Sequence, residues 1–176
     1  MFNQVEKIIF TGPVGAGKTT AIGSISEEPP VGTDVACTDE SRLIKDKTTV
    51  AMDYSYITLE DGTRVHLYGT PGQQRFDFMW EILAKGGIGL VILVNKDHPE
   101  PVEKMEFYLN SFDEFIAETG VVIGITRSGM QDNADVSDFQ ARLLEREQIF
   151  PVIEIDARSS EDVKILVQAL LAILSC

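Results

Sequence analysis

The chain has 176 residues, and its 15 basic and 28 acidic side chains give a formal net charge of −13. A chain of this length buries about 70% of the surface that its unfolded form exposes, so we expect a single domain that needs no disulfide or structural metal. Its negative field repels nucleic acid backbones and anionic lipid headgroups, which argues against nucleic acid binding. We expect a cytoplasmic protein without an integral membrane segment. No apolar run approaches the roughly 20 residues of a membrane span, and two cysteines far apart in sequence suit a reducing compartment.

The first motif is a glycine-rich stretch, Gly12-Pro-Val-Gly-Ala-Gly-Lys-Thr19, which fits the pattern G-x-x-x-x-G-K-[ST]. It follows an apolar run at residues 5–11 that predicts a buried strand, and it precedes a predicted helix at residues 18–27. A strand that continues through a glycine-rich turn into a helix directs backbone N–H groups and the positive end of the helix dipole at one point. The stretch is therefore a predicted P-loop for a polyphosphate. Its predicted ligand-binding residues are Gly12, Val14, Gly15, Ala16, Gly17, Lys18, Thr19 and Thr20.

Two P-loop side chains have specific chemistry. Lys18 is expected to contact the β- and γ-phosphates, and the hydroxyl of Thr19 is expected to bind Mg²⁺. The alternative is a chance glycine-rich turn between a strand and a helix, but the complete pattern stands in the structural context that the motif requires.

The rest of the chain alternates between predicted strands and helices. Residues 31–47 are polar without a sustained period and predict a long loop, placed to fold over a nucleotide. Residues 49–59 alternate in polarity, and Asp61-Gly62 predicts the turn of an antiparallel hairpin with residues 65–68. Apolar runs predict buried strands at residues 88–94, 121–126 and 151–155. Apolar residues at helical spacing predict helices at residues 73–85, 101–118, 135–147 and 160–175, the last with Ser160 in its cap region.

Six predicted strands and five predicted helices in alternation, with one antiparallel hairpin strand, indicate a three-layer α/β fold. We predict a doubly wound, mostly parallel six-stranded sheet with helices on both faces. Ligands of such sheets bind at the carboxyl ends of the strands, which is where the P-loop lies.

The order of these motifs resembles that of the small Ras-like GTPases, a branch of the P-loop GTPases, over essentially the whole chain. Among them it is similar to the bacterial MglA-type branch of gliding-motility and polarity regulators. The resemblance implies one GTPase domain over residues 1–176, with GTP or GDP and Mg²⁺ as ligands. It also implies a switch that changes shape when the γ-phosphate is lost.

The resemblance assigns roles to three segments that follow the P-loop. Thr49, with Thr48 as the register alternative, matches the switch I threonine that binds Mg²⁺ and senses the γ-phosphate; the other interpretation is an ordinary β-branched strand residue. Gly69-Thr-Pro-Gly-Gln-Gln74 resembles the switch II motif D-x-x-G-Q. In that motif Gly72 donates its N–H to the γ-phosphate and Gln73 orients the attacking water. Lys18, Thr49 and Gln73 are thus the predicted catalytic residues, and Thr19 and Thr49 the predicted Mg²⁺ ligands.

Two departures from the family pattern affect catalysis. Gly69 stands where most relatives carry an aspartate that holds Mg²⁺ through water. The MglA-type branch also lacks this aspartate. Val14 narrows the space through which a partner's arginine would enter. We expect slow intrinsic hydrolysis, because an in-line attack gains little without a charge-stabilising cation. A charge-stabilising cation would come from an activating protein or from Arg42 or Arg75 of this chain.

Base recognition is the weakest match to the family. Asn95-Lys96-Asp97 resembles the N-K-x-D motif, but its spacing is short and it follows the fourth strand instead of the fifth, so we interpret it as a loop. After the fifth strand, Thr126 and Arg127 replace asparagine and lysine, and Gly129 stands in place of the aspartate that selects guanine. Asp132 is a substitute if the loop bends.

A second base-binding segment follows the last strand. Asp156, Ala157 and Arg158 resemble the S-A-K loop, whose alanine N–H meets guanine O6, so guanine remains favoured.

Three functions are compatible with these motifs. The first is a GTP/GDP switch in cell polarity, motility or envelope organisation, with a Roadblock/LC7-type activating protein and an effector of the GTP state. All of these are implied by the resemblance. The second is a nucleotide-binding scaffold without turnover, favoured by Gly69, Val14 and Gly129. The third is a P-loop phosphotransferase or ATP-binding protein, which the lack of an arginine-rich lid disfavours.

Overall fold

The computed structural model describes residues 6–36, 49–73, 77–126, 129 and 133–176. Within these residues the strands are β1 (Glu6–Thr11), β2 (Val31–Ala36), β3 (Thr49–Thr58), β4 (Arg64–Gly69), β5 (Gly89–Asn95), β6 (Val121–Thr126) and β7 (Val152–Ile155). The helices are α1 (Lys18–Ile25), α2 (Phe78–Ala84), α3 (Pro101–Ser111), α4 (Asp113–Glu118), α5 (Val136–Glu145) and α6 (Ser160–Leu174).

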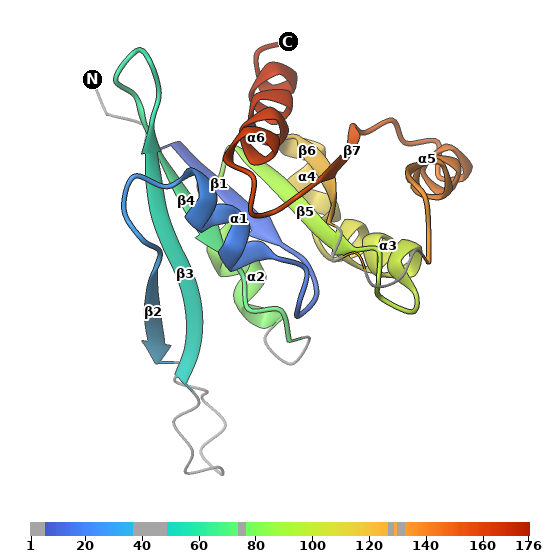
Figure 1. Ribbon diagram of the computed structural model, residues 1–176, viewed down its shortest axis with the longest axis horizontal. Helices are drawn as coiled ribbons and strands as arrows, with labels where there is room; N and C mark the ends of the chain where they lie inside the picture. Colours follow the sequence, from blue (N-terminus) through green and yellow to red (C-terminus); the bar gives the residue numbers. More distant parts are fainter. Residues whose placement is uncertain (1–5, 37–48, 74–76, 127–128, 130–132) are drawn as a thin grey trace.

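The strands form one seven-stranded sheet in the order β2-β3-β4-β1-β5-β6-β7. Strands β4, β1, β5, β6 and β7 are parallel to one another, whereas β3 is antiparallel to both of its neighbours. Figure 1 shows the long β2–β3 pair on one side of the molecule and β7 on the other. The reversal of chain order around β1 creates the crevice at the carboxyl ends of the strands where doubly wound proteins bind ligands.

Helices cover both faces of the sheet, as the alternation of side chains along β1 shows. Ile8 and Phe10 join a core cluster with residues of α1 and α6, while Ile9 joins the opposite cluster with Trp80 of α2 and residues of α3 and α5. Strand β6 is buried at every position because helices lie over both of its faces. The predicted three-layer α/β arrangement is therefore observed (Figure 1).

The sheet has seven strands where the sequence predicted six, because residues 31–36 of the predicted loop form β2. Gly32 and Asp34 have low strand propensity, so nothing local indicates a strand. Strand β2 nevertheless pairs antiparallel with β3, from Val31 opposite Tyr54 to Ala36 opposite Thr49. The backbone groups on the outer edge of β3 are satisfied by this pairing, which is a tertiary effect.

The predicted helix at residues 101–118 is two helices, α3 and α4, which brings the described helices to six instead of five. The break falls at Phe112, with φ −111° and ψ 19°. Its ring is buried and stacks on Trp80, with 5.5 Å between ring centroids. Packing against α2 therefore overrides the helical spacing of the apolar residues.

Other element ends also differ from the predictions. Of the predicted helix at residues 73–85, α2 covers only Phe78–Ala84, so Gln73 lies before it. Helix α6 is capped by Ser159 instead of Ser160, since the Ser159 side chain accepts a hydrogen bond from the Asp162 N–H. Helix α5 begins with a capping box between Asp135 and Asp138.

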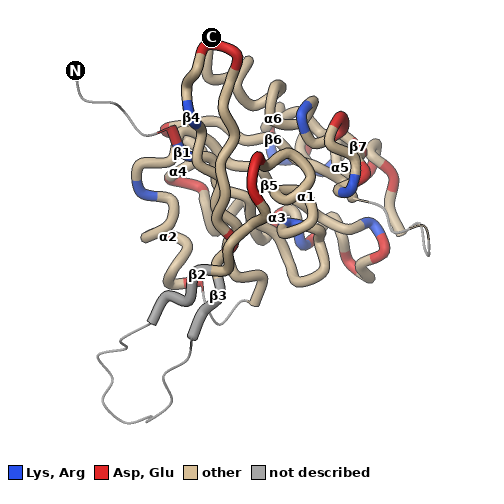
Figure 2. Tube along the Cα trace, turned by 60° about the vertical axis from the view of Figure 1, so that its left-hand side comes forward, with Lys and Arg blue, Asp and Glu red and all other residues tan. Residues whose placement is uncertain are grey.

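Charged positions are spread over strands, helices and turns throughout the described chain (Figure 2). Among the residues that the structure describes, no helix combines the length and the apolar character needed to cross a bilayer.

Candidate nucleotide-binding site

The P-loop connects the carboxyl end of β1 to α1 and has the backbone conformation that its glycines permit. Gly12, Gly15 and Gly17 have φ angles of 147°, 81° and 93°. Gly12 is also sterically constrained, because a Cβ atom on it would lie 2.1 Å from the carbonyl oxygen of Leu93 in β5. Only glycine fits at this position, where the loop crosses the neighbouring strand.

Helix α1 begins directly after this loop, so its amino end faces the loop. Gly17 caps the helix without a side-chain hydrogen bond, and the first bond within the helix runs from the Ala21 N–H to the Gly17 carbonyl, at 2.8 Å. The N–H groups of the first helical residues have no acceptor one turn earlier in the helix, so they suit an anion. The side chains of Thr19 and Thr20 are exposed beside them.

Lys18 is the buried cation of the P-loop. Its Nζ donates hydrogen bonds to the carbonyl oxygens of Gly12, at 2.7 Å, and Pro13, at 2.9 Å. Burial lowers the pKa of Lys18 to about 8, and the negative charge of Asp53 opposes this shift. The amine is thus mostly protonated at neutral pH and held where phosphates would lie.

Two neighbouring strands hold the outer part of the P-loop. The Thr126 hydroxyl, at the end of β6, donates a buried 2.8 Å hydrogen bond to the Ala16 carbonyl. The Asn95 side chain, at the end of β5, donates to the Gly15 carbonyl at 3.4 Å. These contacts preorganise the loop backbone, which reduces the ordering that ligand binding requires.

A cavity of about 250 Å³ lies against the P-loop and unites segments that are distant in sequence. Its lining residues are Gly15, Ala16, Gly17, Thr20, Asn95, Thr126, Asp156, Ala157 and Arg158. The structure thus places the predicted base-binding residues Thr126 and 156–158 beside the predicted phosphate-binding loop. Arg127 and Asp132 lie outside the described residues, and Gly129 is exposed.

The segment at residues 156–158 is ordered by its own hydrogen bonds. Both carboxylate oxygens of Asp156 accept from the Arg158 guanidinium, at 3.0 and 2.8 Å, and Oδ1 also accepts from the Arg158 N–H at 2.9 Å. Ala157 is buried, and its Cβ would stand 3.1 Å from a Cβ on Gly17. This close packing fixes the distance between the segment at residues 156–158 and the start of α1.

The predicted switch II segment lies against the P-loop. A Cβ atom on Gly72 would be 2.7 Å from the Val14 nitrogen and 2.9 Å from Nζ of Lys18. The carbonyl of Gly72 accepts a 3.5 Å hydrogen bond from the Tyr108 hydroxyl, and Trp80 Nε1 donates to the Pro71 carbonyl at 3.3 Å. Gln73 follows with an exposed side chain. The glycine turn is therefore positioned by the buried aromatic side chains of α2 and α3.

Several predicted residues are only partly described. Thr49 is the first residue of β3, opposite Ala36, which places its backbone but not its side chain. Thr48, Arg42 and Arg75 lie outside the described residues.

The oxygen ligands at the start of α1 fit Mg²⁺. This hard cation prefers a few protein oxygens together with phosphates and waters. The exposed hydroxyl of Thr19 donates a hydrogen bond to Oδ2 of Asp53 in β3, so a hydroxyl and a carboxylate stand together beside the P-loop. Within the described residues, no cluster of three or more His, Cys, Asp or Glu side chains suits a metal, so the nucleotide would have to supply part of the coordination.

The sequence interpretation missed two residues at this site, Asp53 and Asn95. Asp53 looked like one polar position in an alternating strand, but the turn at Asp61-Gly62 fixes the hairpin register and places Asp53 opposite Gly69. That register could have identified it. The sequence predicts a loop at Asn95, whereas the structure has it as the last residue of β5, with its side chain donating to the P-loop.

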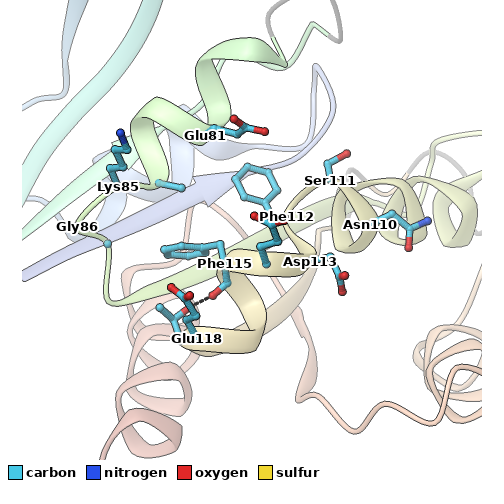
Figure 3. Close-up of a pocket in the computed structure, with 13 residues that line it drawn as sticks. Glu81, Lys85, Gly86, Asn110, Ser111, Phe112, Asp113, Phe115 and Glu118 are labelled. Atoms are coloured by element: carbon cyan, nitrogen blue, oxygen red, sulfur yellow. Dashed lines mark hydrogen bonds between the residues drawn. The ribbon is translucent and has the colours of Figure 1, made fainter.

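A larger cavity, about 740 Å³, lies between α2, α3 and α4, at the ends of the strands opposite to the P-loop. Figure 3 shows Phe112 and Phe115 in its wall with Glu81, Lys85 and Glu118 around it. It adjoins Gly86 and Gly87, before the amino end of β5, whereas the P-loop follows the carboxyl end of β1. Its charged residues are four carboxylates and one lysine, which do not suit a phosphate.

Comparisons with known proteins find relatives along most of the chain. It is 30% identical over 121 residues to the uncharacterized protein MJ1339 of Methanocaldococcus jannaschii, an alignment that covers 65% of this chain and 71% of that protein. It is 25% identical over 168 residues to the Ras-related protein Rab-13 of Rattus norvegicus, covering 92% of this chain and 76% of that protein. No family model matches the chain.

A further relative is the intraflagellar transport protein 22 homolog of Homo sapiens, which is 27% identical over 109 residues. That alignment covers 60% of this chain, which spans only 55% of the relative's length. The similarities to Ras-related proteins agree with the P-loop, the sheet order and the hairpin described above. The chain therefore belongs to the same family as the Methanocaldococcus jannaschii protein MJ1339 and is a distant homologue of the Ras-family GTPases.

Proposed function

We propose that this protein binds GTP and GDP with Mg²⁺ and acts as a molecular switch with slow intrinsic GTP hydrolysis. The observation that carries this proposal is the close approach of Gly72 to Lys18 and Val14, which leaves no room for a Cβ atom on Gly72. A γ-phosphate bound by Lys18 would lie next to the switch II turn, so its presence or loss would change the position of that turn. The distant homology to Ras-family GTPases supports guanine nucleotides as the ligands.

In this proposal the residues of the site have distinct roles. The backbone of the loop from Gly12 to Gly17 and the amine of Lys18 bind the phosphates, and Thr19 and Thr49 bind Mg²⁺. Gln73 orients the attacking water, and Gly72 senses the γ-phosphate. Thr20 and the base-binding residues Thr126, Arg127, Asp156, Ala157 and Arg158 complete the nucleotide site.

Slow hydrolysis follows from the charges next to the phosphates. Within the described residues, Lys18 is the buried cation in contact with the P-loop, and it is needed already for binding. The transition state therefore gains little extra stabilisation from it. A partner that supplies a further cation would accelerate the reaction.

The cellular role rests on family resemblance alone. Similarity to the MglA-type branch supports a role in cell polarity, motility or envelope organisation. It also supports a Roadblock/LC7-type activating protein and an effector of the GTP state. The aromatic ring of Phe78, in the helix after switch II, is exposed and could contact such an effector. Its position would change when the γ-phosphate is lost.

A second candidate function is a nucleotide-binding scaffold without turnover. Gly69 favours it, because no carboxylate from the switch II strand is available to hold Mg²⁺. The two functions differ in one property. A switch binds its effector or exposes its switch segments differently with GTP and GDP, whereas a scaffold does not.

The test is a titration of purified protein with labelled GTP, GDP and ATP, with and without Mg²⁺, followed by assays of phosphate release and hydrogen exchange. The proposal expects binding of guanine nucleotides in preference to ATP, slow phosphate release and stronger protection of the 69–73 turn with a GTP analogue. Lys18→Ala serves as the binding-defective control. Equal protection with GTP analogue and GDP, without phosphate release, would favour the scaffold, and absence of nucleotide binding would overturn both.

A further inference from the structure

Asp53 and Gly69 are cross-strand partners in the hairpin of β3 and β4. Gly69 is the position that lacks the aspartate of the switch II pattern, and Asp53 brings a carboxylate to the same place from the adjacent strand. A Cβ atom on Gly69 would be 3.2 Å from the Cβ of Asp53 and 3.3 Å from its Oδ2. The carboxylate of Asp53 thus lies over Gly69, in the space that a side chain at residue 69 would use.

This carboxylate contacts the P-loop helix. Its Oδ2 accepts a hydrogen bond from the hydroxyl of Thr19, the predicted Mg²⁺ ligand. A threonine hydroxyl has one proton and two lone pairs, so donation to Asp53 leaves the lone pairs of Thr19 Oγ1 available for a cation. Metal ligands are commonly oriented in this way by a hydrogen-bonded carboxylate.

The charge of Asp53 is also placed for a cation. The side chain is half-buried next to Lys18, whose protonated form it stabilises. A partly buried carboxylate is costly unless it is paired, and the Thr19 hydroxyl and the Lys18 charge provide that pairing. A dication held by the Thr19 hydroxyl, by water and by the nucleotide phosphates would also be stabilised by the negative charge of Asp53.

We infer that Asp53 supplies the carboxylate of the Mg²⁺ site, acting from β3 on Thr19 and on the metal-bound waters in place of the aspartate missing at Gly69. This inference rests on the proposed binding of Mg²⁺ and nucleotide. Asp53 is a positioning residue, since it acts on the metal through the Thr19 hydroxyl and water. Catalytic turnover is therefore not its most direct readout.

The test measures how strongly Mg²⁺ slows the release of a fluorescent GDP. Dissociation rates are measured in Mg²⁺ and in EDTA for the wild-type protein, for Asp53→Asn and for Glu60→Gln, which removes one carboxylate charge from the exposed hairpin tip. We expect the ratio of the rate in EDTA to the rate in Mg²⁺ to fall about tenfold or more in Asp53→Asn. The ratio in Glu60→Gln should equal the wild-type ratio.

The EDTA arm separates the two levels of the proposal. Wild-type protein that binds GDP in at least one of the two buffers supports nucleotide binding, and an unchanged ratio in Asp53→Asn would then overturn the role of Asp53 alone. Failure of the wild-type protein to bind GDP in either buffer would instead overturn the proposed function.

A second measurement needs no variant and applies even if Asp53→Asn does not fold. Wild-type protein labelled with ¹³C at the aspartate carboxyls is loaded with GDP and Mn²⁺, and the carboxyl resonances are compared with those of the Mg²⁺ complex. We expect the Asp53 resonance to be broadened far more than that of Asp61 at the hairpin turn. Equal broadening of the two would overturn the inference.

Discussion

Gly72 lies so close to the P-loop that a Cβ atom on it would be 2.9 Å from Nζ of Lys18 and 2.7 Å from the Val14 nitrogen. Gly72→Ala therefore forces the switch II turn away from the P-loop, at a cost of about 1–3 kcal/mol for the overpacked arrangement. We expect GDP binding to be retained and the difference in hydrogen exchange between the GDP and GTP forms to be lost. Exchange mass spectrometry of the 69–73 turn checks this outcome.

The control for this variant is Gly62→Ala, since a Cβ on Gly62 would meet no heavy atom within 4 Å, and the backbone strain that its φ of 85° imposes on alanine lies in the turn between β3 and β4. Any effect of Gly62→Ala should be confined to stability. A nucleotide-dependent exchange pattern in Gly72→Ala that matches the wild-type pattern would contradict the assigned sensing role.

Substitutions of Lys18 and Gln73 are expected to affect nucleotide binding and GTP hydrolysis separately. Lys18→Ala removes a buried amine that points at the phosphate site, and we expect a loss of about 3 kcal/mol or more, at least a hundredfold in Kd. Gln73→Leu changes an exposed side chain beyond the glycine turn, so nucleotide affinity should persist while phosphate release is lost. Equilibrium titration and single-turnover phosphate release measure the two effects, and a similar loss of binding in both variants would reject this division of roles.

Thr126 is expected to stabilise the P-loop through its hydroxyl. Thr126→Val keeps the shape of the side chain but leaves the Ala16 carbonyl without its 2.8 Å hydrogen bond. A buried acceptor left unpaired costs about 1–3 kcal/mol, so both the unfolding free energy and the nucleotide residence time should decrease. Thr126→Ser retains the donor and should restore most of the residence time; if it behaves like valine, packing and not the hydrogen bond holds the loop.

Nucleotide affinity should depend on pH through Lys18. Burial lowers the pKa of its amine to about 8. Phosphates bind the protonated form and raise its pKa in the complex, so binding above that pH takes up a proton. The contribution of this group is constant below the pKa, and above it the affinity falls by at most about tenfold per pH unit.

Calorimetric titrations in buffers of different ionisation enthalpy measure this proton uptake directly. We expect uptake to appear as the pH rises through the Lys18 pKa. Unchanged affinity and no proton uptake on both sides of that pH would show that the amine keeps its ordinary pKa in the free protein.

Local sequence patterns were sufficient for most of the architecture. The apolar runs of β1, β5 and β6 and the turn at Asp61-Gly62 predicted their strands, because burial on both faces and hairpin turns have strong local signatures. The edge strand β2 and the break at Phe112 could not be predicted in this way. The first depends on pairing with β3, and the second on packing against Trp80.

The P-loop was recognisable from eight consecutive residues, because a glycine-rich turn between a strand and a helix binds phosphate through its own backbone. The sequence alone thus predicted the kind of ligand and the end of the strands where we expect it to bind. The tertiary structure decided which side chains from other strands surround that loop, namely Asp53, Asn95 and Thr126. Strand order and register bring these residues together across long sequence separations, and no local pattern encodes such distances.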